Sequence, residues 1–284
     1  MKKTPHGKSV KTMPIGTKIV TYVCLAWALC VSLVPLVWLV LSSLKKDPMA
    51  RPGFRLPESV CMDGYISTFK DLHVFRYFGN SLFVAGMSVL ISVIMISMSA
   101  YVVARMEFKG KKLVNLLLYS TMFIPATALT YPVYNLVHKL HLYDTKAALI
   151  LIYSCSGIAI SFFVIKNYYD NVPGDLEEAA RIDGCGYAMT FIKVIFPIAR
   201  PGIMTAAVLA FLNNWNEYYW ASLVLITREK LTVPALLSTF TTAFTTNYNG
   251  LFSAMVVIIL PPIILYCIFS KFFIEALSGG AVKG

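Results

Sequence analysis

One short stretch of the sequence combines amide, carboxyl and aromatic side chains within an otherwise apolar segment. It reads Asn213-Asn214-Trp215-Asn216-Glu217-Tyr218-Tyr219-Trp220. At helical spacing Asn213, Glu217 and Trp220 share one face, with Asn216 beside them. Aromatic rings stack on the C–H groups of a pyranose while polar groups bind its hydroxyls, so these four residues could line a pathway for a sugar. A buried polar cluster that fixes helix packing has the same pattern, and both interpretations stay open.

The other residues that could do chemistry form no catalytic or metal-binding set. All four histidines lie in the N-terminal tail or in loops: His6, His73, His138 and His141. His138 and His141 have the spacing of two metal ligands, but only Asp144 is near them, which favours an ordinary interfacial pair. An intramembrane hydrolase would need a base beside a nucleophile inside the bilayer, and the sequence offers none. We therefore expect no enzyme activity, no metal site and no cofactor bound by this chain.

The sequence also lacks the glycine-rich loop with which many proteins bind ATP. That loop has the pattern G-x-x-x-x-G-K-[ST]. The nearest approach is Gly7-Lys8-Ser9, where Lys2 occupies the position of the first required glycine. Any nucleotide energy must therefore come from another chain.

Composition indicates a polytopic membrane protein. Of the 284 residues 57% are hydrophobic and 14% are charged, against about 25% charged in soluble domains. The formal net charge of +11 could indicate nucleic-acid binding, but basic residues that flank membrane spans account for it, so no nucleic acid is expected. The six cysteines contain no C-x-x-C pair, which excludes the usual zinc and disulfide patterns. The first apolar run is too long for a cleavable signal peptide.

Six apolar stretches reach the length of about 20 residues that a membrane-spanning helix needs. They are Ile19–Leu41, Ser81–Ala104, Leu113–Val137, Ala147–Tyr168, Ile203–Ile226 and Leu251–Ile274. Prolines lie within several of them, and helix bundles tolerate such kinks. The sequence therefore predicts an all-α, six-span domain over residues 19–274, with tails at 1–18 and 275–284.

The distribution of basic residues predicts the orientation. The N-terminal tail and the loop after the second span are rich in lysine and arginine, while the third and fifth loops carry two basic residues each. The first loop is also basic, but it is long and contains acidic residues too, so it counts for less. Both termini are therefore expected in the cytoplasm. Within the first loop Tyr65, Phe69 and Leu72 share a helical face, which indicates an interfacial helix or, alternatively, contact with an external partner.

A polar segment, Asn171–Gly202, separates the fourth and fifth spans and is built like a helix-turn-helix. Pro173 and Gly174 end the preceding helix, and Asp175 is expected to cap a new one, with Glu178 completing a capping box. Gly184 is expected to end that helix in a left-handed conformation. Two prolines, Pro197 and Pro201, interrupt the helix beyond. Two alanines, Ala179 and Ala180, leave one helix face without bulk, which suits docking against another protein.

Several motifs carry a family resemblance. Glu178-Ala179-Ala180, then Gly184, then Val194-Ile195-Phe196-Pro197 resemble the "EAA" loop of permease subunits in binding-protein-dependent ABC importers. Val194 and Phe196 replace the family's isoleucine and leucine. The segments Ala100–Arg105 with Phe108–Lys111, Trp215–Glu217 and Leu277–Gly284 are similar to further elements of the carbohydrate branch. The resemblance covers roughly residues 78–284 and is nearest to the maltose permease G-type subunit.

The resemblance implies a type I ABC importer permease fold with residues 78–274 as its core, in the cytoplasmic membrane. It implies ATP-driven alternating access for a sugar, a second permease as partner, an extracytoplasmic solute-binding protein, and two ATPase subunits that bind ATP and Mg. The coupling loop, residues 171–202, would contact the ATPase through Glu178, Ala179, Ala180, Arg181, Asp183, Gly184 and Pro197. The C-terminal residues Gly280, Lys283 and Gly284 would reach the same interface, unless they form only a frayed end.

A different class of function stays open from the residues alone. The carboxylate of Glu217 lies within the predicted fifth span, where ionisable residues often mark ion coupling. An ion-coupled secondary transporter or channel that acts alone is therefore the alternative to an ABC permease.

Overall fold

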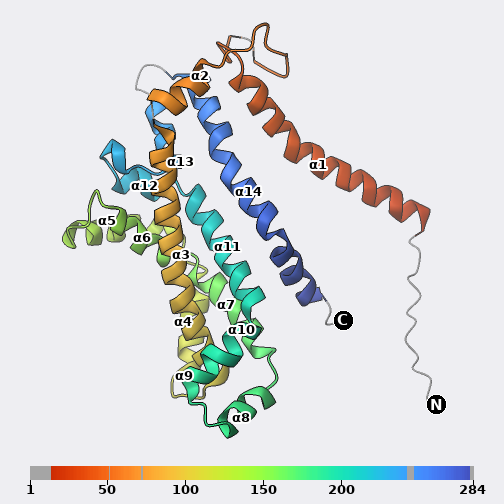
Figure 1. The fold of residues 1–284 in the computed structure, drawn as a ribbon, viewed down its shortest axis with the longest axis vertical. Helices are drawn as coiled ribbons and strands as arrows, with labels where there is room; N and C mark the ends of the chain where they lie inside the picture. The colour runs from red at the N-terminus through yellow and green to blue at the C-terminus, as the bar shows by residue number, and fades with distance from the viewer. Residues whose placement is uncertain (1–13, 51, 72, 242–245, 282–284) are drawn as a thin grey trace.

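The computed structural model describes residues 14–50, 52–71, 73–241 and 246–281 (Figure 1). Within them the chain is mostly helical, and the strand-like pairing is limited to an isolated bridge between Thr241 and Thr246. Three helices are long and apolar enough to cross a membrane unbroken: α1 (Ile15–Ser43), α3 (Val74–Arg105) and α14 (Tyr248–Ala281). Three bent helix pairs bring the number of spans to six by length and composition. The predicted all-α, six-span fold is confirmed.

The predicted third span, Leu113–Val137, is not one straight helix. It consists of α4 (Lys111–Thr121), a 3₁₀ turn η2 (Ala126–Leu129) and α5 (Thr130–Lys139), with a bend of 98° between its halves. The break lies at Pro125, which has no N–H to donate and adopts an extended conformation with ψ 131°.

The fourth span is bent more gently. Its halves are α6 (Lys146–Ser154) and α7 (Ile158–Asp170), which meet at 49°. Gly157 stands between them with φ +65°, a left-handed conformation that other residues adopt at a cost.

The predicted fifth span, Ile203–Ile226, is wrong in its second half. The helix α11 (Arg200–Asn216) ends before Glu217, and a short α12 (Tyr219–Val224) follows after the break. The chain then forms η4 (Arg228–Lys230), α13 (Val233–Leu236) and η5 (Leu237–Phe240) near the upper end of the molecule (Figure 1). On its N-terminal side α11 forms the third bent pair, at 77°, with the segment Tyr187–Ile198.

The central helix of the bundle is α3, which packs on α6, α7 and α11. Small residues recur along its buried face at spacings of three and four, at Ser81, Ala85, Ser88 and Ser92, and again at Ala100. In lipid, where water exclusion does not drive helices together, such small residues let neighbouring helices approach closely. Ser88 and Ser92 donate to carbonyls of α3 itself, as in the bond from Ser88 Oγ to the Val84 carbonyl at 2.7 Å, whereas the Ser81 hydroxyl accepts the Val233 N–H at 2.8 Å.

Two clusters of buried side chains hold the bundle together at its two ends. The first lies where α3 begins and includes Val74, Leu149, Tyr153, Val224 and Leu236. The second lies where α3 ends and includes Tyr101, Phe162, Ile165, Tyr169 and Ile195. The second cluster therefore supports the segment that follows α7.

The long first loop carries a short helical segment, α2 (Asp63–Ile66) and η1 (Ser67–Asp71). A helical segment therefore exists where one was predicted, and its interfacial position stays a prediction. Its buried residues are Gly64 and Thr68, whereas Phe69 of the predicted apolar face is 41% exposed. Tyr65 lies 2.7 Å from Ser43 Oγ through its hydroxyl. The segment is thus attached to the C-terminal end of α1 and the N-terminal end of α14. The third residue of the predicted face, Leu72, lies outside the described residues.

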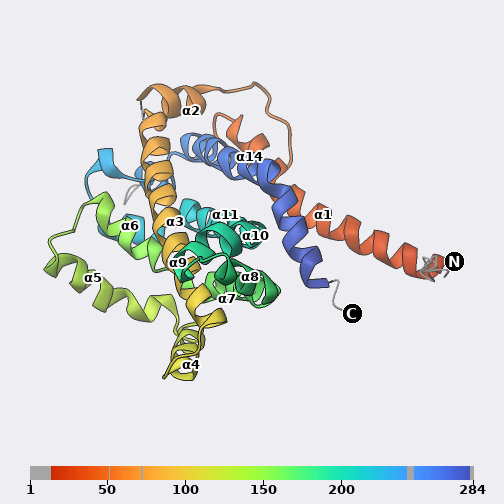
Figure 2. The same cartoon turned by 60° about the horizontal axis from the view of Figure 1, so that its bottom comes forward.

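The first helix leaves the bundle. In both views α1 diverges from the rest of the molecule (Figures 1 and 2). Its contact with α14 includes Trp38, whose ring lies edge-on to Phe252 at 5.3 Å. Along the 18 consecutive residues of α1 that are most apolar, no residue is buried by the rest of this chain. A helix that is apolar on all sides and uncovered by its own chain requires lipid or another protein around it.

Candidate functional site

The helix α8 (Asp175–Ile182) lies at the lower end of the molecule, beyond the membrane-spanning helices (Figure 1). It ends as predicted: Gly184 has φ +80°. The Gly184 N–H donates to the Arg181 carbonyl at 3.0 Å and the Cys185 N–H donates to the Ala180 carbonyl at 2.9 Å. This is the Schellman arrangement, which satisfies the last carbonyls of the helix.

The start of α8 differs from the prediction. Its N-cap is Gly174, without a capping side chain, and Asp175 is the first helical residue. The predicted capping box from Asp175 to Glu178 is therefore absent. The first turn nevertheless contains Asp175, Glu177 and Glu178, whose negative charge is favourable beside the partial positive charge of a helix N-terminus.

One face of α8 is anchored to this chain by a buried ion pair. Arg105, the last residue of α3, lies 3.0 Å from the Glu177 carboxylate, and their side chains are only 16% and 9% exposed. A terminal guanidinium nitrogen of Arg105 also donates to the Val172 carbonyl. The same face buries Ala180. The prediction that Ala179 and Ala180 together offer a free surface is therefore wrong for Ala180, which is covered by its own chain.

The opposite face of α8 is open. Glu178, Ala179, Arg181 and Asp183 are exposed. Exposed apolar side chains continue this surface onto the next helix, α9 (Tyr187–Thr190), and the π-helical turn η3 (Phe191–Ile195): Leu176, Ile182, Tyr187, Met189 and Ile192. We call this surface the α8 face. An exposed apolar patch with a charged rim is typical of a protein interaction site.

The last residue of the predicted coupling set is placed differently from the others. Pro197 is half-buried in the short α10 (Phe196–Ile198), which follows η3 and precedes α11. The chain turns at Ala199, so the helix is interrupted where the prolines predicted. Pro197 therefore shapes the return of the loop to the bundle rather than the α8 face itself.

The conformation of Gly184 predicts a measurable cost of substitution. Gly184→Ala is expected to destabilise the end of α8 by about 1–2 kcal/mol, because a Cβ is strained at positive φ even though no atom lies within 4 Å of it. Gly186→Ala is the matched control, since Gly186 has the same free space but φ −73°. Hydrogen exchange of residues 175–185 measures the effect. Equal protection in both variants would contradict this prediction.

The polar stretch in the fifth span does not form one helical face. Glu217 stands at the break between α11 and α12, and its carboxylate accepts the N–H groups of Trp220 at 2.8 Å and Ala221 at 3.2 Å. The Tyr153 hydroxyl of α6 donates to the same carboxylate at 2.6 Å. Glu217 therefore caps α12 and ties it to α6. The predicted shared face of Asn213, Glu217 and Trp220 is wrong.

The four predicted pathway residues separate into different surroundings. Asn213 and Asn216 are exposed, whereas Glu217 and Trp220 are half-buried. Asn216 lines a cavity of about 640 Å³ between α11, α13, η5 and α14. Trp220 lines a different and largely apolar cavity of about 680 Å³ enclosed by α4 to α7. Asn216 and Trp220 therefore line separate cavities, although Glu217 and Trp220 remain in contact through the hydrogen bond described above.

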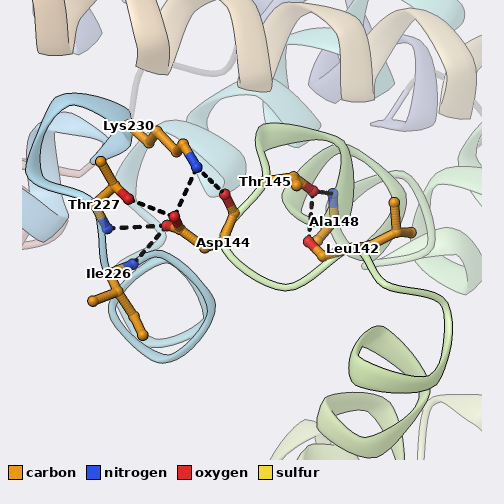
Figure 3. A network of polar contacts seen from close by, with 7 residues as sticks. All are labelled: Leu142, Asp144, Thr145, Ala148, Ile226, Thr227 and Lys230. Atoms are coloured by element: carbon orange, nitrogen blue, oxygen red, sulfur yellow. Dashed lines mark hydrogen bonds and ion pairs between the residues drawn. The ribbon is translucent and has the colours of Figure 1, made fainter.

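A polar network joins two loops that are distant in sequence, one before α6 and one after α12. Figure 3 shows Asp144, before α6, accepting the N–H groups of Ile226 at 2.9 Å and Thr227 at 3.0 Å. Lys230 donates to the Asp144 carboxylate at 2.7 Å, and the Thr227 hydroxyl also donates to it. Asp144 itself has φ +55°, which aspartate tolerates better than most residues. The network fixes the position of α12 relative to α6.

The charge of Asp144 has a pH-dependent consequence. Burial alone raises the pKa of Asp144, but the bonds from Lys230, Thr227 and Ile226 outweigh it and hold the pKa well below its usual range. A carboxylate with a depressed pKa stabilises the fold above its unfolded-state pKa, about 3.9, and this contribution is lost as the pH falls below that value. Asp144→Asn is expected to cost about 1–3 kcal/mol at pH 7, measured by thermal unfolding in detergent. The difference in stability between the variant and the wild type is expected to narrow below about pH 4. A difference that does not change with pH would contradict a stabilising charge on Asp144.

The C-terminal residues are only partly within the described structure. The helix α14 continues to Ala281, so Gly280 is helical rather than part of an irregular tail. Lys283 and Gly284 lie outside the described residues. Their contact with an ATPase stays a prediction.

The comparisons with known proteins place the chain in a family. Residues 18–278 match the family described as binding-protein-dependent transport system inner membrane component. The chain belongs to this family. The resemblance drawn from Glu178 to Pro197 is thereby confirmed.

Named relatives agree over nearly the whole chain. The arabinooligosaccharides transport system permease protein AraQ of Halalkalibacterium halodurans is 33% identical over 96% of this chain and 99% of its own length. The trehalose transport system permease protein SugB of Mycobacterium tuberculosis is 32% identical over 95% of this chain and 100% of its own. A chain of a bacterial ABC transporter that imports alginate superposes with a TM-score of 0.80 at 23% identity, covering 93% of this chain and all of that one. The fold is that of a type I ABC importer permease.

Proposed function

We propose that this chain is the membrane-spanning subunit of an ABC importer that carries a carbohydrate into the cytoplasm, powered by ATP that a separate subunit hydrolyses. The relatives named above are sugar-transport permeases, which supports the substrate class. The single observation that carries the proposal is the α8 face. It is an exposed docking surface, firmly anchored to the bundle, in a chain whose sequence contains no nucleotide-binding loop.

The α8 face is the surface on which an ATPase subunit docks. Glu178 and Arg181 supply charged contacts, Ala179 permits a close approach, and Ile182, which is 86% exposed, offers an apolar anchor. Arg181 lies over the Tyr187 ring at 5.0 Å, which holds the guanidinium at the edge of this face. ATP and Mg bind to that partner, not to this chain.

A second permease covers the exposed helices. The α1 helix has an apolar surface that its own chain leaves uncovered, and a partner helix bundle beside it completes the membrane domain. At the opposite end from α8, the segment of α2 and η1 together with the segment from η4 to η5 forms the surface that receives a solute-binding protein. A solved alginate transporter in complex with a periplasmic protein that holds an alginate pentasaccharide superposes with a TM-score of 0.65 over 92% of this chain, which supports this arrangement at the level of fold.

Transport then proceeds by alternating access. Closure of two ATPase subunits moves the two α8 helices, and each α8 moves α3 through the Arg105–Glu177 ion pair and α7 through the short turn at Val172. The spans move as rigid bodies because their buried faces are packed, and the pathway opens first to one side and then to the other.

A charge reversal on the α8 face tests the proposal. Glu178→Lys is expected to lower ATPase co-purification and sugar uptake more than tenfold, about the loss expected when a charged interface contact is reversed. Glu107→Lys is the matched control, because Glu107 carries an 89% exposed side chain at the same end of the molecule. Normal uptake in Glu178→Lys would overturn the proposal. Sugar flux by this chain alone, driven by a proton or sodium gradient without ATP, would support an ion-coupled transporter instead.

A further inference from the structure

The break between α11 and α12 opens onto a cavity of about 640 Å³ at the upper part of the bundle. Asn216 and Tyr218, the residues on either side of the capping carboxylate, line it. Ser238 of η5 and Thr241 line it from the other side, with Leu237 and Ile258 among the apolar lining. A volume of this size is within the usual range of about 300–1,000 Å³ for small-molecule sites.

The polar groups at this cavity are suited to hydroxyls. The Ser238 hydroxyl donates its proton to the Ala235 carbonyl at 2.7 Å. Its oxygen can therefore still accept a hydrogen bond from a ligand hydroxyl. Asn216 donates one amide hydrogen to the Leu212 carbonyl at 2.9 Å and retains a second donor and its oxygen. The side chain of Tyr218, which is 46% exposed, supplies an aromatic face and a hydroxyl. An aromatic face among hydroxyl and amide groups is the surface that a pyranose ring requires.

The charge of the lining narrows the ligand class. The described residues that line the cavity are all uncharged. The adjacent carboxylate of Glu217 is directed to Tyr153 and to the start of α12, where it is already bonded. An uncharged lining favours a neutral sugar over one that carries carboxylate or phosphate groups, because it offers such a group no partner of opposite sign.

We infer that this cavity is a contact site for a neutral carbohydrate on this subunit, formed by Asn216, Tyr218 and Ser238. The inference rests on the proposed function and deepens it. Glu217 is then a positioning residue: by capping α12 and binding Tyr153 it holds Asn216 and Tyr218 at the cavity on either side of the helix break.

The test uses the complete transporter, reconstituted in vesicles with its solute-binding protein. The probes are trehalose and arabinotriose as neutral sugars and an alginate oligosaccharide as an acidic one. The readouts are sugar accumulated per ATP hydrolysed and ATPase stimulation by the sugar-loaded binding protein. The double variant Asn216→Ala/Ser238→Ala is expected to lose at least about tenfold in sugar moved per ATP, since two hydrogen bonds are removed. ATPase stimulation stays within about twofold, because the α8 face is unchanged.

Ser222→Ala is the matched control. The Ser222 hydroxyl donates to the carbonyl three residues earlier, as the Ser238 hydroxyl does, but Ser222 is exposed on α12 and lies away from the cavity. Its sugar-to-ATP ratio is expected to equal that of the wild type. Should the double variant fail to assemble, Tyr218→Phe removes only one hydroxyl and is expected to lower the ratio about twofold to tenfold.

The outcomes separate this inference from the proposed function. A wild-type complex that moves no sugar and shows no stimulated ATPase activity contradicts the proposed function. A wild-type complex that imports sugar while the double variant, or Tyr218→Phe, keeps the same ratio overturns only the contact site. Import of the acidic oligosaccharide in preference to both neutral sugars overturns the assignment of a neutral ligand.

Discussion

Arg105→Gln is expected to abolish sugar uptake while the chain still inserts into the membrane. The change leaves the Glu177 carboxylate buried without its cation, and breaking a buried pair in this way costs about 3–5 kcal/mol. It also removes the hydrogen bond that the Arg105 guanidinium donates to the Val172 carbonyl. The turn between α7 and α8 is then no longer bonded to the end of α3. The α8 helix then moves without α3. ATPase activity that no longer responds to sugar, measured in the reconstituted transporter, is the expected signature.

An exposed ion pair at the same end provides the control. Lys111 lies 2.8 Å from the Glu107 carboxylate, whose side chain is 89% exposed. Exposed pairs contribute about 0–1 kcal/mol, so Glu107→Gln is expected to leave uptake and stability near wild type. The swap Arg105→Glu/Glu177→Arg tests pairing directly and is expected to restore part of the uptake. Arg105→Gln behaving like Glu107→Gln would show that the buried pair does not connect α8 to α3.

Gly202→Val is expected to prevent assembly of the bundle. A Cβ at Gly202 would lie 2.2 Å from the Tyr168 ring, so α11 and α7 approach more closely than any side chain allows. Overpacking of this kind costs about 1–3 kcal/mol or more even when neighbours shift, and here a whole aromatic ring must move. The yield of folded protein in detergent, measured by monodispersity and thermal unfolding, is expected to fall sharply.

Gly86→Ala is the control for a glycine within a helix. Nothing lies within 4 Å of a Cβ at Gly86 of α3, and replacing an open helical glycine by alanine stabilises a helix by up to about 1 kcal/mol. A second change, Tyr168→Ala, is expected to recover part of the folded yield of Gly202→Val, since it removes the ring. Equal yields for the variants at Gly202 and Gly86 would mean that α7 and α11 do not meet at this point.

Sequence reasoning succeeded where the signal is local. The uninterrupted apolar runs at α1, α3 and α14 predicted long helices, and the glycine after Asp183 predicted the left-handed end of α8. The motif spacing from Glu178 to Pro197 also identified the family. Each of these signals depends on residues that are neighbours along the chain.

The break at Glu217 was missed because apolar length alone does not locate a helix end. The stretch from Ile203 to Ile226 is apolar enough to span a membrane, and a glutamate within it was assumed to stay helical. The carboxylate instead accepts backbone N–H groups three and four residues later, as a capping residue does. Pro125 was a local signal for the 98° bend in the third span. It did not lead to a predicted break, because membrane helices often contain proline without ending.

The contacts that anchor the site were beyond local pattern. Arg105 and Glu177 are joined across α3 and α8, and Tyr153 reaches Glu217 across α6 and the helix break. Only the packed bundle brings these residues together. Sequence reasoning therefore found the exposed side of the segment Asn171–Gly202 and missed the buried contacts that connect it to the spans.

The central claim is that α8 is a lever moved by a separate ATPase. A photo-crosslinking amino acid at Ile182, which is 86% exposed, tests it in native membranes. We predict a cross-link to a protein that also carries a photoreactive ATP label, and none when Glu178→Lys is present as well. Cross-links to lipid alone, or labelling of this position by a reagent confined to the outside of the cell, would contradict the account.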